Sequence, residues 1–92
     1  MKYIEKFQLI KLDDDKKYIV TNSVIYDNDN YALLINAEDI KDHILALVSK
    51  NDNDLEINPI DLKNESNKEF IFRLINLFEK DMNEDFRVKN DD

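Results

Sequence analysis

The chain has 92 residues and a formal net charge of −8, because 21 Asp and Glu side chains outnumber 13 Lys and Arg side chains. A chain of this length forms one small domain, and its surplus of carboxylates argues against direct binding to DNA, RNA or anionic lipid, which all require a cationic face. The sequence contains no cysteine and no glycine, which excludes disulfides, thiolate metal sites and the glycine-rich loops that cradle phosphates.

Two runs near the start of the chain, at 3–12 and 17–26, are rich in aromatic and β-branched residues. Three aspartates at 13–15 separate them, so we predict that the two runs form an antiparallel hairpin. Within the second run, the two-residue period of a strand assigns four side chains to one face: Tyr18, Val20, Val24 and Tyr26.

Three further strands are expected after this hairpin. Residues 31–36 are apolar on both faces of a strand, which is typical of a strand that lies centrally in a sheet or is covered on both sides. A polar connection at 37–42 leads to strands at 43–50 and 55–60. Pro59 lacks the backbone N–H that a central strand needs, so the fifth strand should lie at an edge of the sheet.

Asp and Asn have to form the turns, because the chain offers no glycine. The stretches DNDN at 27–30 and NDND at 51–54 each join two of the expected strands. Asn and Asp tolerate a positive φ better than other residues with a side chain, and they hydrogen-bond neighbouring backbone groups. We therefore expect both stretches to form turns unaided, and turn formation together with solubility is a sufficient reason for the acid clusters.

An amphipathic helix is predicted from about residue 67 to residue 83. Ser66 followed by Glu69 matches a capping box at its start. Seven apolar residues recur at three- and four-residue spacing and form one stripe of this helix: Phe70, Ile71, Leu74, Ile75, Leu77, Phe78 and Met82. The predicted fold is α+β, an antiparallel sheet of about five strands in hairpins with one C-terminal amphipathic helix packed on one face. This single domain should span 1–83, and 84–92 should form a flexible acidic tail.

Few residues are suited to catalysis. His43 is the only histidine, and neither Thr21 nor any serine stands in a recognisable nucleophile elbow. The acidic stretches begin like calcium-binding loops, but they lack the glycine that such loops need and then run into strand residues. We therefore expect no enzyme activity, no metal site and no cofactor.

If the strands alternate in direction, the turns of the sheet gather acidic residues at its two ends. We take these residues as the candidate partner-binding positions: Asp13, Asp14, Asp15, Glu38, Asp39 and Asp42 at one end, and Asp27, Asp29, Asp52 and Asp54 at the other. Fixed carboxylates can stand in for phosphates, so these ends are suited to a basic surface on another protein.

Both faces of several strands carry apolar residues, whereas a single helix can shield only one face of a sheet. Leu33 and Ile35 oppose Leu34, for example. We therefore predict a homodimer or a partner protein docked on the uncovered face.

The order of four stretches resembles the small bacterial proteins grouped as domain of unknown function 1292: LDDDKKYIV, YDNDNYALLI, HILALVSKNDNDLEI and NKEFIFRLINLFE. The resemblance spans roughly residues 8–80 and implies an α+β layout. It transfers no functional residue. The chain departs from the family pattern where Asp-Lys-Lys stands in place of an Asp-Gly turn.

Together these features predict a non-catalytic, acidic protein-binding module. We expect an inhibitor from a phage or mobile element, similar to anti-CRISPR proteins, that mimics nucleic acid and occupies the basic surface of a host defence nuclease. The alternative is a bacterial adaptor or regulator from a family of unknown function. Eleven Lys against two Arg, with twelve Asn and eleven Ile, indicate AT-rich codons, and we expect the cytoplasm of a bacterium or phage-infected host as the location.

Overall fold

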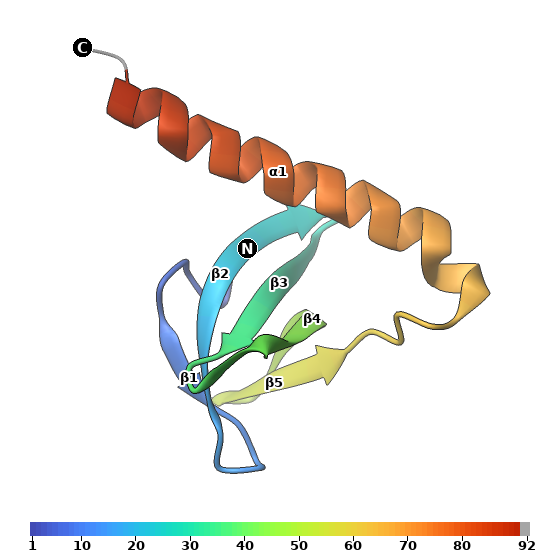
Figure 1. Cartoon of the computed structure of the whole chain (residues 1–92). Coiled ribbons are helices and arrows are strands. Elements are labelled where there is room, and N and C mark those ends of the chain that lie inside the picture. Colours follow the sequence, from blue (N-terminus) through green and yellow to red (C-terminus); the bar gives the residue numbers. More distant parts are fainter. Residues whose placement is uncertain (91–92) are drawn as a thin grey trace. The chain divides into compact units, whose positions relative to one another are not determined.

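The computed structural model describes the backbone of residues 1–90 and the side-chain surroundings of residues 1–82. The chain divides into two compact units, Met1–Ile60 and Asp61–Asp92. The first unit holds a five-stranded antiparallel sheet and the second holds a C-terminal helix (Figure 1). This arrangement confirms the α+β class and the number of strands, and the helix covering one face of the sheet stays a prediction.

Neighbouring strands in the sheet are also neighbours along the chain, so the sheet is a meander. The strands are β1 (Leu9–Lys11), β2 (Lys17–Tyr26), β3 (Asp29–Asn36), β4 (Asp39–Asn51) and β5 (Asp54–Pro59). β5 is an edge strand that contains Pro59, as predicted. β1 is much shorter than the predicted run, which leaves most of 3–12 outside the ladder.

The fourth strand begins earlier than the sequence predicted. We expected a polar connection over 37–42, but Asn36 pairs with Asp39 across a turn of only two residues. A register irregularity follows, because the next pair joins Ile35 to His43. The extra residues on β4 therefore form a bulge, which a polar sequence accommodates at the end of a sheet.

Asp and Asn do adopt the backbone conformations that usually call for glycine. Asp27 and Asn28 have φ values of 51° and 70°, between the paired residues Tyr26 and Asp29. Positive φ at both central residues is what a two-residue type I′ hairpin turn requires. Asp52 has a φ of 57° in the turn between β4 and β5. The prediction of glycine-free turns is thus confirmed at both stretches.

A bulge in β2 reverses the predicted assignment of its faces. Val20 pairs with Leu34, but Asn22 pairs with Leu33, so Thr21 is an extra residue on β2. An extra residue exchanges the two faces of a strand beyond that point. Ser23 therefore shares the face of Val20. Our prediction that Val24 and Tyr26 lie on the face of Tyr18 and Val20 was wrong.

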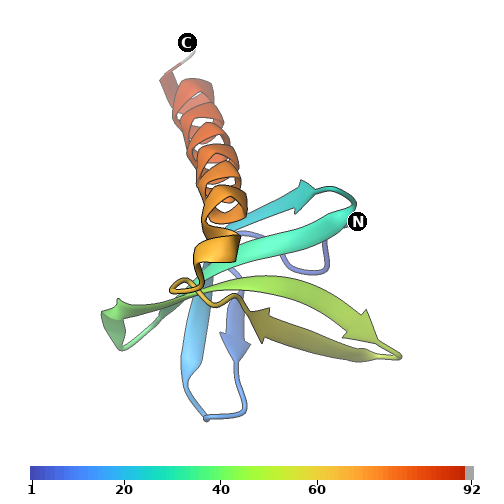
Figure 2. The same cartoon turned by 90° about the vertical axis from the view of Figure 1, so that its right-hand side faces the viewer.

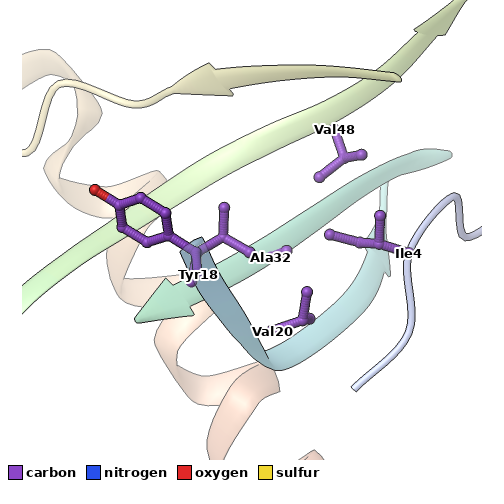
Figure 3. Packing of buried hydrophobic residues seen from close by; sticks show 6 residues of the cluster. Ile4, Tyr18, Val20, Ala32 and Val48 are labelled. Atoms are coloured by element: carbon purple, nitrogen blue, oxygen red, sulfur yellow. The ribbon is translucent and has the colours of Figure 1, made fainter. Parts of the chain in front are cut away.

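The sheet is strongly twisted and curls (Figure 2), and one of its faces encloses a core within the first unit. The core residues are Ile4, Tyr18, Val20, Ala32, Leu34 and Val48, with Ile10, Leu12, Ile44 and Ile57 packed against them (Figure 3). The curled strands and the segment before β1, which contributes Ile4, together surround this core.

The segment before β1 belongs to this core although it is not a strand. Ile4 is buried, and its carbonyl oxygen accepts a hydrogen bond from the Ser23 hydroxyl at 2.8 Å. The Tyr3 N–H donates to Asn30 Oδ1 at 2.9 Å. Asn30 Nδ2 in turn donates to Ser23 Oγ at 3.0 Å and to the Val24 carbonyl at 3.1 Å. The buried side-chain amide of Asn30 on β3 therefore links the N-terminal segment to β2 and β3.

The second unit begins with a short 3₁₀ helix, η1 (Glu65–Asn67), which leads into α1 (Lys68–Asn90). Asn64, rather than Ser66, is the N-cap, because its Oδ1 accepts the Ser66 N–H at 3.1 Å. The predicted capping box was wrong, since the added 3₁₀ turn moves the cap two residues earlier.

Glu69 likewise has a different partner from the one predicted, because it pairs with Arg73 at 2.8 Å one helical turn along. The helix extends past residue 83, so 84–90 are helical where we expected a tail, and 91–92 lie outside the described residues. No helix in the described part of the chain is long and apolar enough to cross a membrane.

Candidate functional site

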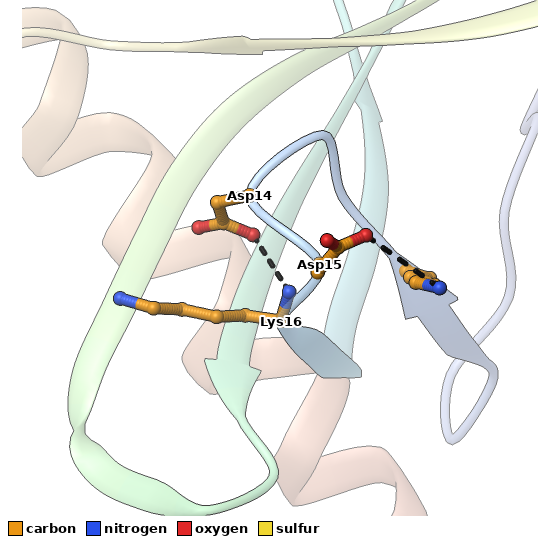
Figure 4. Close-up of polar contacts among 4 residues, drawn as sticks. Asp14, Asp15 and Lys16 are labelled. Atoms are coloured by element: carbon orange, nitrogen blue, oxygen red, sulfur yellow. Dashed lines mark hydrogen bonds and ion pairs between the residues drawn. The ribbon is translucent and has the colours of Figure 1, made fainter.

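The turn between β1 and β2 carries the first group of predicted site residues (Figure 4). The Asp15 N–H donates to the Leu12 carbonyl at 2.9 Å, and the Leu12 N–H donates to the Lys16 carbonyl at 3.0 Å. Asp15 has a φ of 65° and occupies the position that glycine favours in a three-residue hairpin loop. Its carboxylate lies 3.6 Å from the Lys11 ammonium.

Asp14 has a role in the same turn, because its Oδ1 accepts the Lys16 N–H at 2.9 Å. This bond fixes the direction of the Asp14 side chain and leaves the carboxylate exposed. Asp13 and Asp15 are exposed as well. The three carboxylates are therefore displayed on a turn whose backbone is well defined, and the turn-forming and partner-binding interpretations do not exclude each other.

The turn between β3 and β4 lies at the same end of the sheet, because antiparallel neighbours alternate in direction. Asn36 Oδ1 accepts the Glu38 N–H at 2.9 Å, and Asp39 Oδ1 accepts the Lys41 N–H at 3.1 Å. Glu38 and Asp39 are exposed. Five of the six acidic residues predicted for this end thus present exposed carboxylates.

Asp42 differs from the other five because it is half-buried and hydrogen-bonded to two side chains. Its Oδ2 accepts the Tyr18 hydroxyl at 3.0 Å and Asn36 Nδ2 at 3.1 Å. These bonds join β2, β3 and β4 near their shared end. Asp42 therefore links three strands. It adds negative charge to this end of the sheet, but its Oδ2 is already occupied by two hydrogen bonds.

The same contacts change two pKa values. The hydrogen bonds from Asn36 and Tyr18 lower the pKa of Asp42 below its ordinary value of 3.8, with smaller contributions from Lys16 and His43, while desolvation opposes the shift. Burial raises the pKa of the Tyr18 phenol above 10.0, and the hydrogen bond to Asp42 and the charges of Asp42 and Asp14 raise it further. The charges of Asp14 and Asp42 therefore both favour the neutral form of the Tyr18 phenol.

The Asp42 contact predicts a pH dependence of stability. A carboxyl whose pKa is lower in the folded state stabilises the fold above its unfolded pKa and loses this contribution as the pH falls through the folded value. The free energy of unfolding should therefore decline below about pH 4. Tyr18→Phe removes one of the two hydrogen bonds, so its decline should be smaller. Urea denaturation across this pH range measures both proteins.

Tyr3→Phe is the control, because Tyr3 is an exposed tyrosine. Its free energy of unfolding should decline with falling pH as steeply as that of the wild-type protein. If the free energy of Tyr18→Phe declines just as steeply, the hydrogen bond does not lower the pKa of Asp42, and the prediction is contradicted.

The second predicted group lies at the opposite end, in the turns after β2 and β4. Asp27, Asp29, Asp52 and Asp54 are all exposed. Lys50 is the one cationic side chain within 26–30 and 50–54. Here the backbone geometry explains the choice of Asp27 and Asp52, which both have a positive φ.

Sequence reasoning missed a groove that adjoins the first acidic end. Its volume is about 640 Å³. Residues of β1 and the following turn line one side, and residues of β5 line the other: Ile10, Lys11, Leu12, Asp13 and Asp14, then Leu55, Glu56, Ile57, Asn58 and Pro59, with Ile44 from β4. No sequence signal marks this groove, because it exists only once the sheet curls and brings its two edge strands to one cavity.

In the described part of the chain, no group of three or more His, Cys, Asp or Glu side chains is placed to hold a metal ion. The homodimer or docked partner stays a prediction. Fewer apolar residues now support it, because one of the two apolar faces lines the core of the sheet. The apolar residues Leu34, Ile44 and Val48 belong to the core that the sheet itself encloses. By register, Leu33 and Leu45 lie on the other face, which is the face that a partner or a helix would have to cover.

Comparison of the chain with models of known protein families, with curated proteins and with solved structures finds no match. The resemblance to domain of unknown function 1292 therefore stays a prediction, and the site has to be interpreted from its own chemistry.

Proposed function

We propose that this protein is a non-catalytic, acidic module that binds the basic, nucleic-acid-binding surface of another protein. The proposal is supported by one observation above all: two acidic turns lie at the same end of the sheet and carry the exposed carboxylates of Asp13, Asp14, Asp15, Glu38 and Asp39. Backbone hydrogen bonds fix Asp14 and Asp39 in these turns. Fixed anions lose little conformational freedom on binding, so they are suited to replace a row of phosphates.

The proposal includes a biological setting. An inhibitor made by a phage or mobile element, which blocks a host defence nuclease as anti-CRISPR proteins do, needs a compact anionic surface and no catalytic group of its own. The net charge of −8 also favours fast association with a cationic partner at low salt.

Capture of partner proteins from the source cell tests this function with two matched variants. Asp13, Asp14 and Asp15 are changed together to asparagine in the first variant, and Asp27, Asp52 and Asp54 in the second. Asparagine keeps the Oδ1 acceptor and tolerates a positive φ, so both variants should keep their turns. Each variant loses three charges, which separates the effect of position from that of total charge.

The captured proteins should be nucleic-acid-binding, and added DNA or RNA should displace them. The first variant should bind such a partner roughly tenfold more weakly at physiological salt, with a shallower salt dependence. Equal weakening by the second variant would assign binding to both ends. If neither variant changes the affinity, or if nucleic acid does not compete, the proposal is wrong. A partner without affinity for nucleic acid would favour an adaptor or regulator instead.

A further inference from the structure

The groove between β1 and β5 is lined by the two edge strands of the sheet, which have no further strand partner among residues 1–90. Its lining combines apolar side chains of the inner face with carboxylates on the rim, and its volume of about 640 Å³ is within the range of about 300–1,000 Å³ that is usual for ligand sites. Both walls are edge strands, so they offer backbone hydrogen-bonding groups as well as side chains.

The register of the ladder identifies which backbone groups of the edge strands point away from the neighbouring strand. The Ile60 N–H donates to the Leu45 carbonyl at 2.8 Å, and hydrogen-bonded pairs alternate along an antiparallel ladder. Leu55 and Ile57 are therefore at non-bonded positions with respect to β4, and their N–H and C=O groups point away from it. In β1, the Leu12 N–H donates to the Lys16 carbonyl. By the same alternation, Leu9 and Lys11 are at non-bonded positions with respect to β2, and their backbone groups point away from it.

The directions of the two edge strands decide which of them a segment can extend. β1 and β5 are the first and fifth strands of an antiparallel meander, but the twist of the sheet turns them far from parallel: in Figure 2 the blue β1 arrow points down and the olive β5 arrow points to the left. One straight segment therefore cannot pair with both edges. It can pair antiparallel with β5 as a sixth strand, where its inward side chains cover the groove and its backbone covers an exposed edge of the sheet.

The side chains around the groove specify the chemistry of this segment. Ile10, Ile44 and Ile57 present apolar surface to it. The rim carries three exposed carboxylates, those of Asp13, Asp14 and Glu56, against the ammonium of Lys11. Because successive side chains of a strand point to opposite sides, an apolar residue should alternate with a lysine or arginine. A second copy of this chain is disfavoured, since each copy carries a net charge of −8.

We propose that the groove binds an extended, basic segment of a partner protein by strand addition to β5. This inference rests on the proposed function, because it names the part of a basic partner that the module engages. It adds a backbone-mediated mode of binding that surface charge alone does not require.

Amide hydrogen exchange followed by nuclear magnetic resonance tests the inference on the full chain. The probe is a synthetic peptide in which valine and lysine alternate. On binding, exchange of the Leu55 and Ile57 amides should slow by roughly tenfold or more, because these N–H groups gain acceptors, whereas the Leu9 and Lys11 amides of β1 should keep their rates. The same peptide with glutamate in place of lysine should not bind, and neither should a version methylated on its backbone nitrogens.

Leu55→Pro provides the matched test on the protein, with Leu55→Ala as its control. Proline removes the Leu55 N–H that points away from β4, which an edge strand tolerates because the ladder with β4 does not use it. Alanine keeps the N–H and removes most of the side chain. The proline variant should bind the lysine peptide roughly tenfold more weakly than the alanine variant. If the proline variant does not fold, the methylated peptide decides the question.

Two outcomes overturn strand addition. The first is a lysine peptide that binds while the Leu55 and Ile57 amides exchange at their original rates, which would leave binding to the acidic surface and therefore the proposed function intact. The second is a lysine peptide that does not bind at millimolar concentration. Failure of the capture experiment with the aspartate variants, by contrast, would overturn the proposed function itself.

Discussion

Replacing Leu34 by alanine should lower the free energy of unfolding by about 2–5 kcal/mol, the range for leucine truncations in a packed core. Leu34 is 0% exposed and lies on a central strand, where it is paired with Val20 on one side and Ile44 on the other. Domains of this size have a total stability of only about 5–14 kcal/mol. The variant should therefore lose a large share of its stability, and urea denaturation measures the difference.

Leu9→Ala is the matched control, because it makes the same chemical change at a residue that is 56% exposed on the edge strand β1. Its effect should stay within about 0.5 kcal/mol. Similar losses for the two variants would show that the curled face of the sheet is not the main core.

Asn30→Ala should be nearly as damaging, although Asn30 belongs to a stretch that reads as a turn. Its side chain forms hydrogen bonds with Tyr3, Ser23 and Val24, and the residue is 1% exposed. Each buried group left without a partner costs about 1–3 kcal/mol. We expect a loss of at least about 3 kcal/mol in chemical denaturation, together with faster exchange of the Tyr3 amide.

Asn53→Ala makes the same change in the second acidic turn, where the side chain is exposed. Its effect should be small. If Asn30→Ala is equally mild, the hydrogen bonds of Asn30 do not hold the N-terminal segment in place, and the segment is fastened by the packing of Ile4 alone.

The turns could be predicted because their chemistry is local. A chain without glycine uses Asp and Asn in hairpin turns where φ is positive, and Asp15, Asp27, Asn28 and Asp52 all show this. The remaining positive φ among the described residues, 70° at Phe7, lies in the segment before β1 and could not be predicted from turn chemistry. Strand identity could be predicted for the same reason, from β-branched and aromatic runs. Local signals also indicated the helix, although the first turn was misassigned because Asn64 and Ser66 are both competent caps.

The faces of β2 could not be predicted, because they depend on a single extra residue. Nothing in the letters around Thr21 marks a bulge, yet the bulge moves Ser23 to the inner face and makes it a partner of Asn30. The predicted faces were therefore right before the bulge and wrong after it.

The candidate site was predictable only in its composition. The alternation of strand direction correctly assigned the acidic turns to the two ends of the sheet. The distinct role of Asp42 depends on contacts with Tyr18 and Asn36 from two other strands. The groove depends on how far the sheet curls, which is set by side-chain packing over the whole unit rather than by any short stretch.

The meander order of the strands has a consequence for how the chain folds. Each strand pairs with its neighbours in sequence, so every pairing closes a short loop and costs little chain entropy. Folding can start at the β2–β3 hairpin and add one strand at a time, and it should be fast for an all-antiparallel sheet. The N-terminal segment is the exception, since the bond from Tyr3 to Asn30 spans 27 residues. We therefore expect this segment to dock last, onto a sheet that is already formed.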